Sequence, residues 1–277
     1  MKKFIDFWRN TTHWKNILWV LIALFLLFAF LGIKQASDNL NIQSVEVHID
    51  QSVDLAFIDS SKVLEIVSQV VKRPIIGCER KRLNLALIER RLESYPFIDQ
   101  ADVVVDFSGK LMLKVIQREP ILRIINAQGL SYYVAKNGYK MPLHTDYTPR
   151  VMVASGNITE TLMDSSFVKS PIVKDLLSIA NYCSSNAFWK AQIEQLYVDN
   201  YNDLLLIPKV GNHSIVFGSA EHLESKFARL LTFYNKGLNA VGWQKYQQIN
   251  LKFEGQIVAE KQKYIFIPKT DSTTTIQ

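Results

Sequence analysis

The 277-residue sequence has little of what an enzyme, a metalloprotein or a disulfide-rich secreted domain requires. Its two cysteines, Cys78 and Cys183, are too few for a disulfide framework and match no metal-site spacing. They are interpreted as separate buried thiols in different domains, and a bridge between them is the less favoured alternative. The sequence has no phosphate-binding glycine loop, no Gly-x-Ser-x-Gly elbow and no His-Glu-x-x-His pair. These absences predict no cofactor, no metal and no catalytic activity.

The remaining polar residues offer two weak candidates for chemistry. His213 and His222 are nine positions apart, one in an expected strand and one at an expected helix start, so a shared metal is disfavoured. Asp102 and Asp106 lie at i and i+4 of an expected strand and therefore share one face. Paired carboxylates can do acid–base work, but a solvated strand face explains them better.

Beyond the first 15 residues, basic and acidic residues nearly balance, and the net charge is small. Lys2, Lys3, Arg9 and Lys15 against Asp6 account for +3 of the formal net charge of +6. The rest of the chain is only mildly basic, unlike the clustered footprint of a nucleic-acid-binding protein. This charge distribution predicts no nucleic-acid partner. The lack of catalytic and phosphate-binding motifs gives no reason to expect a small-molecule substrate, and none is predicted.

Uncharged apolar runs are also rare, and the single long one covers residues 16–33. Eighteen helical residues span about 27 Å, close to the roughly 30 Å hydrocarbon core of a bilayer. A cleaved signal peptide is the alternative, but its apolar region is usually shorter and ends in small residues. Here the run contains three phenylalanines and is followed by Leu31-Gly32-Ile33-Lys34, so a retained anchor is favoured.

The charge asymmetry predicts the orientation of this anchor. Basic residues resist translocation, so residues 1–15 should be a cytoplasmic stub and the rest should be extracytoplasmic. Trp14 and Trp19 would lie near the headgroups. The large Leu and Phe side chains show no small-xxx-small pattern, which favours a simple tether.

After a linker at residues 34–41, residues 42–119 read as strand, helix, helix, strand, strand. The first helix begins at the capping residues Asp59-Ser60-Ser61, and the second begins at Asn84 and ends at Tyr95-Pro96. Ser108-Gly109 separates the last two strands as a hairpin. This order predicts one small α+β domain with both helices on one sheet face. The expected strands cover residues 42–49, 98–107 and 110–117.

Residues 120–260 consist of short strands separated by turns, with two helices. The first three strands form a meander in which Asn137-Gly138 makes a tight hairpin. One helix begins near Ser170-Pro171, and another covers residues 223–234 with Gly237 as its stop. Residues 261–277 form an extension whose polar end is expected to be disordered. The expected strands are 122–125, 130–135, 139–143, 151–154, 193–198, 204–208, 213–217, 248–253 and 256–259.

Five stretches in this order resemble motifs of the FtsQ/DivIB family of bacterial cell-division proteins. The departures are Ala135 and Asn250 where Asp is usual, Lys252 where Arg is usual, and Glu119 directly before Pro120. Each motif is weak alone, and the match depends on their order across residues 1–260. The stretches are Tyr95–Ala101, Leu111–Pro120, Tyr133–Leu143, Val216–Leu230 and Ile249–Phe253.

The resemblance implies an α+β fold with a single N-terminal transmembrane helix, a POTRA domain (β-α-α-β-β) and then a mainly antiparallel β domain with flanking helices. It further implies a non-enzymatic divisome scaffold of the bacterial inner membrane, at the division septum, that links early and late septal assembly. Family members add a strand from FtsB/FtsL coiled-coil partners to the edge of their final strand. The matching partner-binding residues here are Lys252, Phe253, Glu254, Gln256, Val258, Ala259 and Glu260.

Several alternatives stay open at this stage. Phe253 is either a partner-contacting aromatic or a core aromatic of the closing strand. In the POTRA domain, residues 42–49 and the second helix are the candidate contacts for other division components. The whole protein could instead be a POTRA-bearing chaperone or secretion component that binds unfolded clients. A tethered periplasmic hydrolase is the weaker alternative, and it predicts a concave pocket with convergent polar groups.

Overall fold

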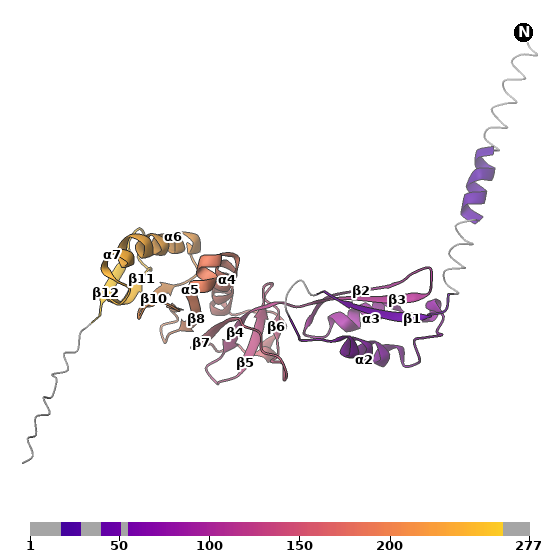
Figure 1. Ribbon diagram of the computed structural model, residues 1–277, viewed down its shortest axis with the longest axis horizontal. Helices are drawn as coiled ribbons and strands as arrows, with labels where there is room; N and C mark the ends of the chain where they lie inside the picture. The colour runs from indigo at the N-terminus through magenta and orange to yellow at the C-terminus, as the bar shows by residue number, and fades with distance from the viewer. Residues whose placement is uncertain (1–17, 29–39, 51–54, 263–277) are drawn as a thin grey trace, which may run out of the picture. The chain divides into compact units, whose positions relative to one another are not determined.

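The computed structural model describes residues 18–28, 40–50 and 55–262. The chain divides into two compact units, Met1–Arg118 and Glu119–Gln277, which are described separately (Figure 1). The fold class is α+β, with a three-stranded sheet in the first unit and a nine-stranded mixed sheet in the second.

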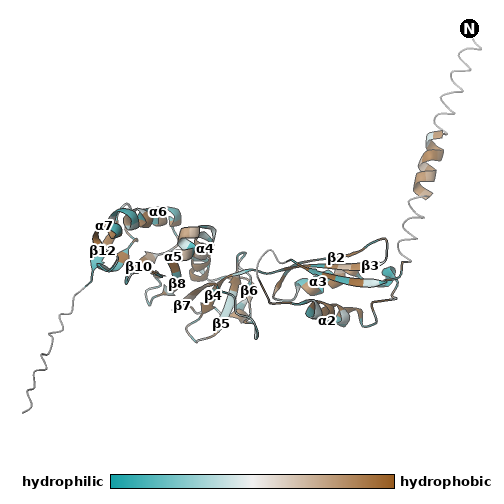
Figure 2. Cartoon of the chain, in the orientation of Figure 1, coloured by the Kyte–Doolittle hydropathy of each residue, from teal (hydrophilic) through white to brown (hydrophobic). Residues whose placement is uncertain are grey.

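Residues 18–28 are helical, and all of them are apolar and exposed (Figure 2). The predicted membrane segment at residues 16–33 extends at both ends outside the described residues. No helix among the described residues is long and apolar enough to cross a membrane. The predicted stub at 1–15, most of the linker at 34–41 and most of the extension at 261–277 also lie outside the described residues.

The first unit has the predicted order of strands and helices. Its strand order is β1-β3-β2, with β1 parallel to β3 and β2 antiparallel to β3. The Asp59 side chain accepts a hydrogen bond from Lys62 N at 2.8 Å, and Asn84 accepts one from Leu87 N at 3.0 Å, so both predicted N-caps are present. The elements are β1 (Ser44–Ile49), α2 (Ser60–Val71), η1 (Arg80–Arg82), α3 (Leu85–Glu93), β2 (Ile98–Val105) and β3 (Lys110–Gln117).

One face of this sheet forms the core of the first unit. Leu111, Leu113 and Val115 alternate along β3 and are fully buried. Both helices turn their apolar stripes toward this face, on the same side of the sheet in Figure 1. The buried helix residues are Val63, Ile66, Val67, Ile88 and Leu92.

Carboxylates of α3 cover the outer edge of β2. Glu89 Oε1 accepts a hydrogen bond from Val103 N at 3.0 Å, and Glu93 Oε1 accepts one from Ala101 N at 3.4 Å. Two N–H groups that would otherwise be available to another strand are therefore occupied. The edge at β1 has no such cover among the described residues.

The second unit is built on a sheet in the order β12-β11-β10-β9-β8-β7-β4-β5-β6. Its elements are β4 (Pro120–Ile125), β5 (Ser131–Ala135), β6 (Lys140–Met141), β7 (Met152–Gly156), η2 (Leu162–Asp164), α4 (Pro171–Ser185), α5 (Ala187–Gln192), β8 (Ile193–Val198), β9 (Leu204–Pro208), β10 (Ser214–Gly218), α6 (Leu223–Phe233), η3 (Tyr234–Leu238), α7 (Asn239–Val241), β11 (Tyr246–Asn250) and β12 (Val258–Lys261).

Pairing within this sheet is mixed, with both antiparallel and parallel neighbours. β4, β5 and β6 form the predicted antiparallel meander. β7 is parallel to both β4 and β8, and α4 and α5 connect it to β8. β11 is parallel to β10, with α6 between them in the chain. A parallel neighbour needs a long crossover connection, because a tight turn can only reverse the strand direction. The crossover from β4 to β7 contains β5 and β6 instead of a helix.

The core of this unit lies between the sheet and the helices α4, α5 and α6, which lie on one side of it (Figure 1). Trp189 of α5 is the largest fully buried side chain and packs on Phe227 with ring centroids 4.8 Å apart. Lys140 is buried as well, with Nζ 3.1 Å from Glu160 Oε1. Glu160 also accepts hydrogen bonds from Lys169 N and Ser170 N. Removal of either partner would leave the other charge buried and unpaired, which is strongly destabilising.

The sequence prediction was wrong at the end of the helix after β10. The helix does not stop at Gly237 but continues through η3 and α7 to Gly242, which has φ +94°. Gly237 instead allows close packing, because a Cβ there would lie 3.1 Å from the Phe233 ring. The helix therefore ends where positive φ is required rather than at the first glycine.

Candidate functional site

The last described strand forms the open edge of the nine-stranded sheet. β12 is antiparallel to β11, with Ile249 opposite Ala259 and Gln248 opposite Glu260. The strand order ends at β12, and no other described segment pairs with its outer side. The opposite edge differs, because Lys140 N of β6 donates to Ser166 O at 2.8 Å. Within the described residues, the edge at β12 is therefore the one that can accept a further strand.

The predicted continuous strand at residues 248–253 is wrong in its second half. β11 ends at Asn250, whose side chain accepts a hydrogen bond from Lys252 N at 2.9 Å and so starts a turn. Gly255 lies in this turn with φ +69°, and β12 begins at Val258. The seven predicted residues are therefore split between a turn and an edge strand.

Phe253 lies in the turn with 49% of its surface exposed. It is not a core aromatic, so that alternative is wrong. Lys252 and Glu254 beside it are also exposed, and Lys252 Nζ lies 2.5 Å from Asp203 Oδ2. The turn thus presents one apolar ring between two charged side chains.

The residues of β12 divide between the two faces of the sheet. Residues directly opposite each other in an antiparallel pair share a face, so Ala259 lies on the core face with buried Ile249. Val258 and Glu260 lie on the other face, where both are exposed. Gln256 is exposed just before the strand.

Arg229 of α6 fixes the turn to the body of the unit. Its Nη1 donates to Phe253 O and to Gln256 O, each at 2.6 Å, and its Nη2 donates to Leu251 O at 3.1 Å. One guanidinium therefore holds three carbonyls of the connection between β11 and β12. The resemblance motif around residues 216–230 contains Arg229, but sequence alone did not assign it this contact.

An open groove of about 610 Å³ lies between α6 and this turn. Small and polar residues at helical spacing form the α6 side, and basic Arg229 and Lys236 are its charged members. No sequence pattern indicated this groove, because its shape depends on where the turn packs against α6. Its lining residues are Ser225, Ala228, Arg229, Thr232, Phe233, Lys236, Gly237, Gly255, Gln256 and Ile257.

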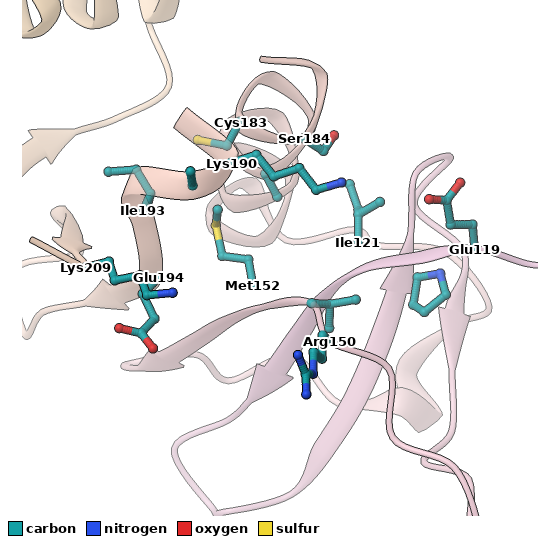
Figure 3. Close-up of a pocket in the computed structure, with 14 residues that line it drawn as sticks. Glu119, Ile121, Arg150, Met152, Cys183, Ser184, Lys190, Ile193, Glu194 and Lys209 are labelled. Carbon is teal, nitrogen blue, oxygen red and sulfur yellow. The ribbon is translucent and has the colours of Figure 1, made fainter. Parts of the chain in front are cut away.

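A second concavity of about 470 Å³ bears on the hydrolase alternative (Figure 3). Its floor includes Ile121, Met152 and the buried Cys183, and burial raises the pKa of the Cys183 thiol to about 12. That thiol is therefore not a thiolate nucleophile near neutral pH. Among the charged residues of the rim, Glu194 and Lys209 lie beside each other in Figure 3 and the others lie apart from them. The five side chains do not gather at one point, as the polar groups of a catalytic pocket do. These rim residues are Glu119, Arg150, Lys190, Glu194 and Lys209.

The two histidines singled out from the sequence have separate surroundings. His213 is buried, with Nε2 3.0 Å from Tyr234 Oη, and burial lowers the pKa of His213. His222 is the N-cap residue of α6, in the left-handed conformation. No group of three or more metal-ligating side chains occurs among the described residues.

The candidate carboxylate pair is also separated by local structure. Asp106 lies in the β2–β3 turn, where Oδ1 accepts hydrogen bonds from Ser108 N and Lys110 N, both at 2.9 Å. Hydrogen bonds from Ser108 and Lys110 lower the pKa of Asp106. Asp102 is an exposed residue of β2. Asp106 thus stabilises the turn, as Asp commonly does. Cys78 and Cys183 are both free and buried, one in each unit.

Comparison with known families gives two matches. Residues 119–260, about half of the chain, match the family model described as FtsQ/DivIB, C-terminal related. Residues 42–116 match the POTRA-like domain. Domains of both kinds are non-enzymatic scaffolds. No curated protein sequence matches the chain closely enough to count as a relative.

Proposed function

Because this chain belongs to the FtsQ/DivIB family, and such domains point to a role in cell division, we propose that it is a divisome scaffold. It docks FtsB/FtsL-like coiled-coil partners by adding one of their strands to β12. In doing so it links early and late steps of septal assembly.

The open edge at β12 is the observation that supports this proposal most directly. Of the two edges of the nine-stranded sheet, the one at β6 is paired with the chain's own residue Ser166. An added strand at β12 would gain main-chain hydrogen bonds from groups that otherwise face water. Affinity would come mainly from this backbone pairing.

Side chains around the edge would supply selectivity. Val258 and Glu260 stand on the face opposite the core, so they would contact alternate residues of an added strand. Phe253 in the turn is an exposed aromatic, the kind of residue that often anchors an interface. Lys252 and Glu254 would form the charged rim, where they affect the rate of association more than affinity.

Membrane anchoring is the second part of the proposal. Residues 16–33 would cross the inner membrane, with residues 1–15 in the cytoplasm and both folded units outside it. The family is one of septal, membrane-anchored proteins, which agrees with the apolar run and the basic stub in the sequence. The anchor would keep the docking edge close to partners that cross the same membrane.

Pull-down of detergent-solubilised FtsB/FtsL-like proteins tests the docking site. The intact protein should capture them, and Phe253→Lys and Val258→Asp should each lose most of the capture while remaining folded. Leu130→Lys is the matched control, because Leu130 is a comparably exposed apolar turn residue of the same unit. It should capture partners as the intact protein does.

The outcomes separate the parts of the proposal. Capture by the intact protein and by both β12-region variants would place the docking site elsewhere on the scaffold. No capture by the intact protein, together with binding of unfolded outer-membrane or secreted clients, would favour the POTRA chaperone instead. Normal septa after depletion of the protein would contradict the role in cell division.

A further inference from the structure

The first unit has a distinct end where the described chain enters it at residues 40–43. The N–H of Ile42 donates to Cys78 O at 2.8 Å, and the N–H of Gln43 donates to Gly109 O at 2.9 Å. The loop after α2 and the β2–β3 turn therefore flank the same short segment, at one end of the unit in Figure 1. Three stretches that are distant in sequence meet there.

The loop on one side of this segment is strongly basic. Residues 72–82 contain five basic residues and one acidic residue, Glu79. Glu79 Oε2 lies 3.0 Å from Arg82 Nε and 3.4 Å from Lys81 Nζ, so one carboxylate is shared by two cations. Five basic residues against one acidic residue give this loop a formal charge of +4. The basic residues are Lys72, Arg73, Arg80, Lys81 and Arg82.

Two large apolar side chains protrude at the same end. Ile76 lies in the basic loop and is 64% exposed, and Phe107 lies in the β2–β3 turn and is 89% exposed. The turn is not loose, because Asp106 accepts hydrogen bonds from both Ser108 N and Lys110 N. The Phe107 side chain is therefore exposed to solvent on a turn that is stabilised by hydrogen bonds.

Chain connectivity places this end near the bilayer. This step depends on the membrane anchor of the proposed function, which ends at Ile33. Seven residue steps separate Ile33 from Leu40, and an extended chain covers at most about 24 Å over that distance. The entry segment at residues 40–43 therefore lies within that reach of the membrane exit, and the basic loop and the turn that carries Phe107 flank this segment.

We propose that this end of the POTRA-like unit docks on an anionic phospholipid surface. The cations of residues 72–82 would meet headgroup phosphates, while Ile76 and Phe107 would enter the interface between headgroups and acyl chains. Neither set of contacts is strong alone, but the anchor supplies a high local concentration. The contact fixes the direction in which the first unit leaves the membrane.

Site-specific photocrosslinking in nanodiscs tests this contact with the full chain. A photoreactive phenylalanine analogue replaces Phe107, and crosslinks to lipid are measured with phosphatidylcholine alone and with added phosphatidylglycerol. The same analogue at Met163, which is 90% exposed in the other unit, is the control for exposure. We expect a severalfold higher lipid yield at position 107 than at 163, and a rise in the 107 yield with phosphatidylglycerol.

A charge-reversal pair tests the basic loop. Arg73→Glu with Arg82→Glu should lower the yield at position 107 severalfold. Arg90→Glu with Arg91→Glu makes the same charge change on α3 and should leave it unchanged. Arg91 lies with Lys62 around a small pocket, and Lys62 is at the opposite end of α2 from the basic loop.

The results distinguish this inference from the proposed function. If the chain resists extraction from membranes but position 107 gives no more lipid crosslinks than position 163, the docking inference is refuted and the anchor stands. A yield indifferent to phosphatidylglycerol would also refute it. A chain extracted at high pH as a peripheral protein would instead refute the anchor. Partner capture through β12 is independent of both arginine pairs and should not change.

Discussion

Replacement of Arg229 by methionine should loosen the edge strand without unfolding the unit. Arg229 makes three hydrogen bonds to carbonyls of the turn, two at 2.6 Å and one at 3.1 Å. Bonds from a charged donor contribute about 1.5–3 kcal/mol each when buried, but those from Nη1 are exposed and count for less. A local loss of about 2–3 kcal/mol is therefore expected.

Hydrogen exchange measured by mass spectrometry reports this loss directly. Opening of the edge should become roughly 30- to 140-fold more frequent, since each 1.4 kcal/mol is a factor of ten. Amides of residues 256–262 should exchange faster by that factor, whereas those of the central strand β8 should not change. Arg123→Met is the control, because Arg123 also donates a side-chain hydrogen bond in this unit, to Ser131 Oγ at 3.0 Å.

Two results would decide whether geometry or charge matters. Arg229→Lys keeps the charge, but its single ammonium lacks the planar fork of the guanidinium, so most of the protection should still be lost. Unchanged protection of residues 256–262 in the methionine variant would refute the idea that this arginine fixes the turn. Loss of protection together with intact partner capture would separate the turn from docking.

Three further predictions concern stability. Glu160→Gln should lower the free energy of unfolding measured in urea by about 3–5 kcal/mol, because it leaves the buried Lys140 ammonium without its counter-charge. A loss below about 1 kcal/mol would contradict this role of the ion pair. The lowered pKa of His213 means that the folded state binds fewer protons than the unfolded state. The free energy of unfolding should therefore be highest above about pH 6.5 and fall below it by up to about 1.4 kcal/mol per pH unit. His213→Phe should remove this pH dependence. Gly156→Ala should cost about 1–3 kcal/mol of stability, because φ is +106° and the new Cβ would lie 2.1 Å from the Val198 carbonyl oxygen. Gly129→Ala should cost less, because Gly129 also has positive φ but no atom lies within 4 Å of the new Cβ.

Local patterns predicted the elements that have a clear period or cap. The strands Ile193–Val198 and Leu204–Pro208 have the predicted bounds, and the helix at Pro171 begins where Pro was expected at its first turn. Short elements were missed, such as α5 (Ala187–Gln192), because six residues are too few to establish a helical period. The break at Asn250 was also missed, since one side-chain hydrogen bond decides it.

Less of the candidate site than of the helices and strands around it could be predicted from the sequence. That β12 lies at an edge follows from the parallel pairing of β10 with β11, a long-range choice that no local pattern contains. The contact from Arg229 to the turn spans more than twenty residues of chain. Family resemblance pointed to residues 248–260, which include the edge strand of the large sheet, but the predicted strand at 248–253 placed Phe253 in a strand rather than in a turn.

The carboxylates of Glu89 and Glu93 along β2 have a consequence for self-association. A fibril that stacks one kind of sheet edge to edge needs both edges of that sheet open, one for each neighbour. Here α3 closes one edge of the small sheet, and the large sheet likewise has one edge occupied by its own chain at Ser166. Each sheet can therefore join at most one foreign strand. When two copies of the same sheet pair at that edge, neither copy keeps an open edge, so pairing of like sheets stops at two.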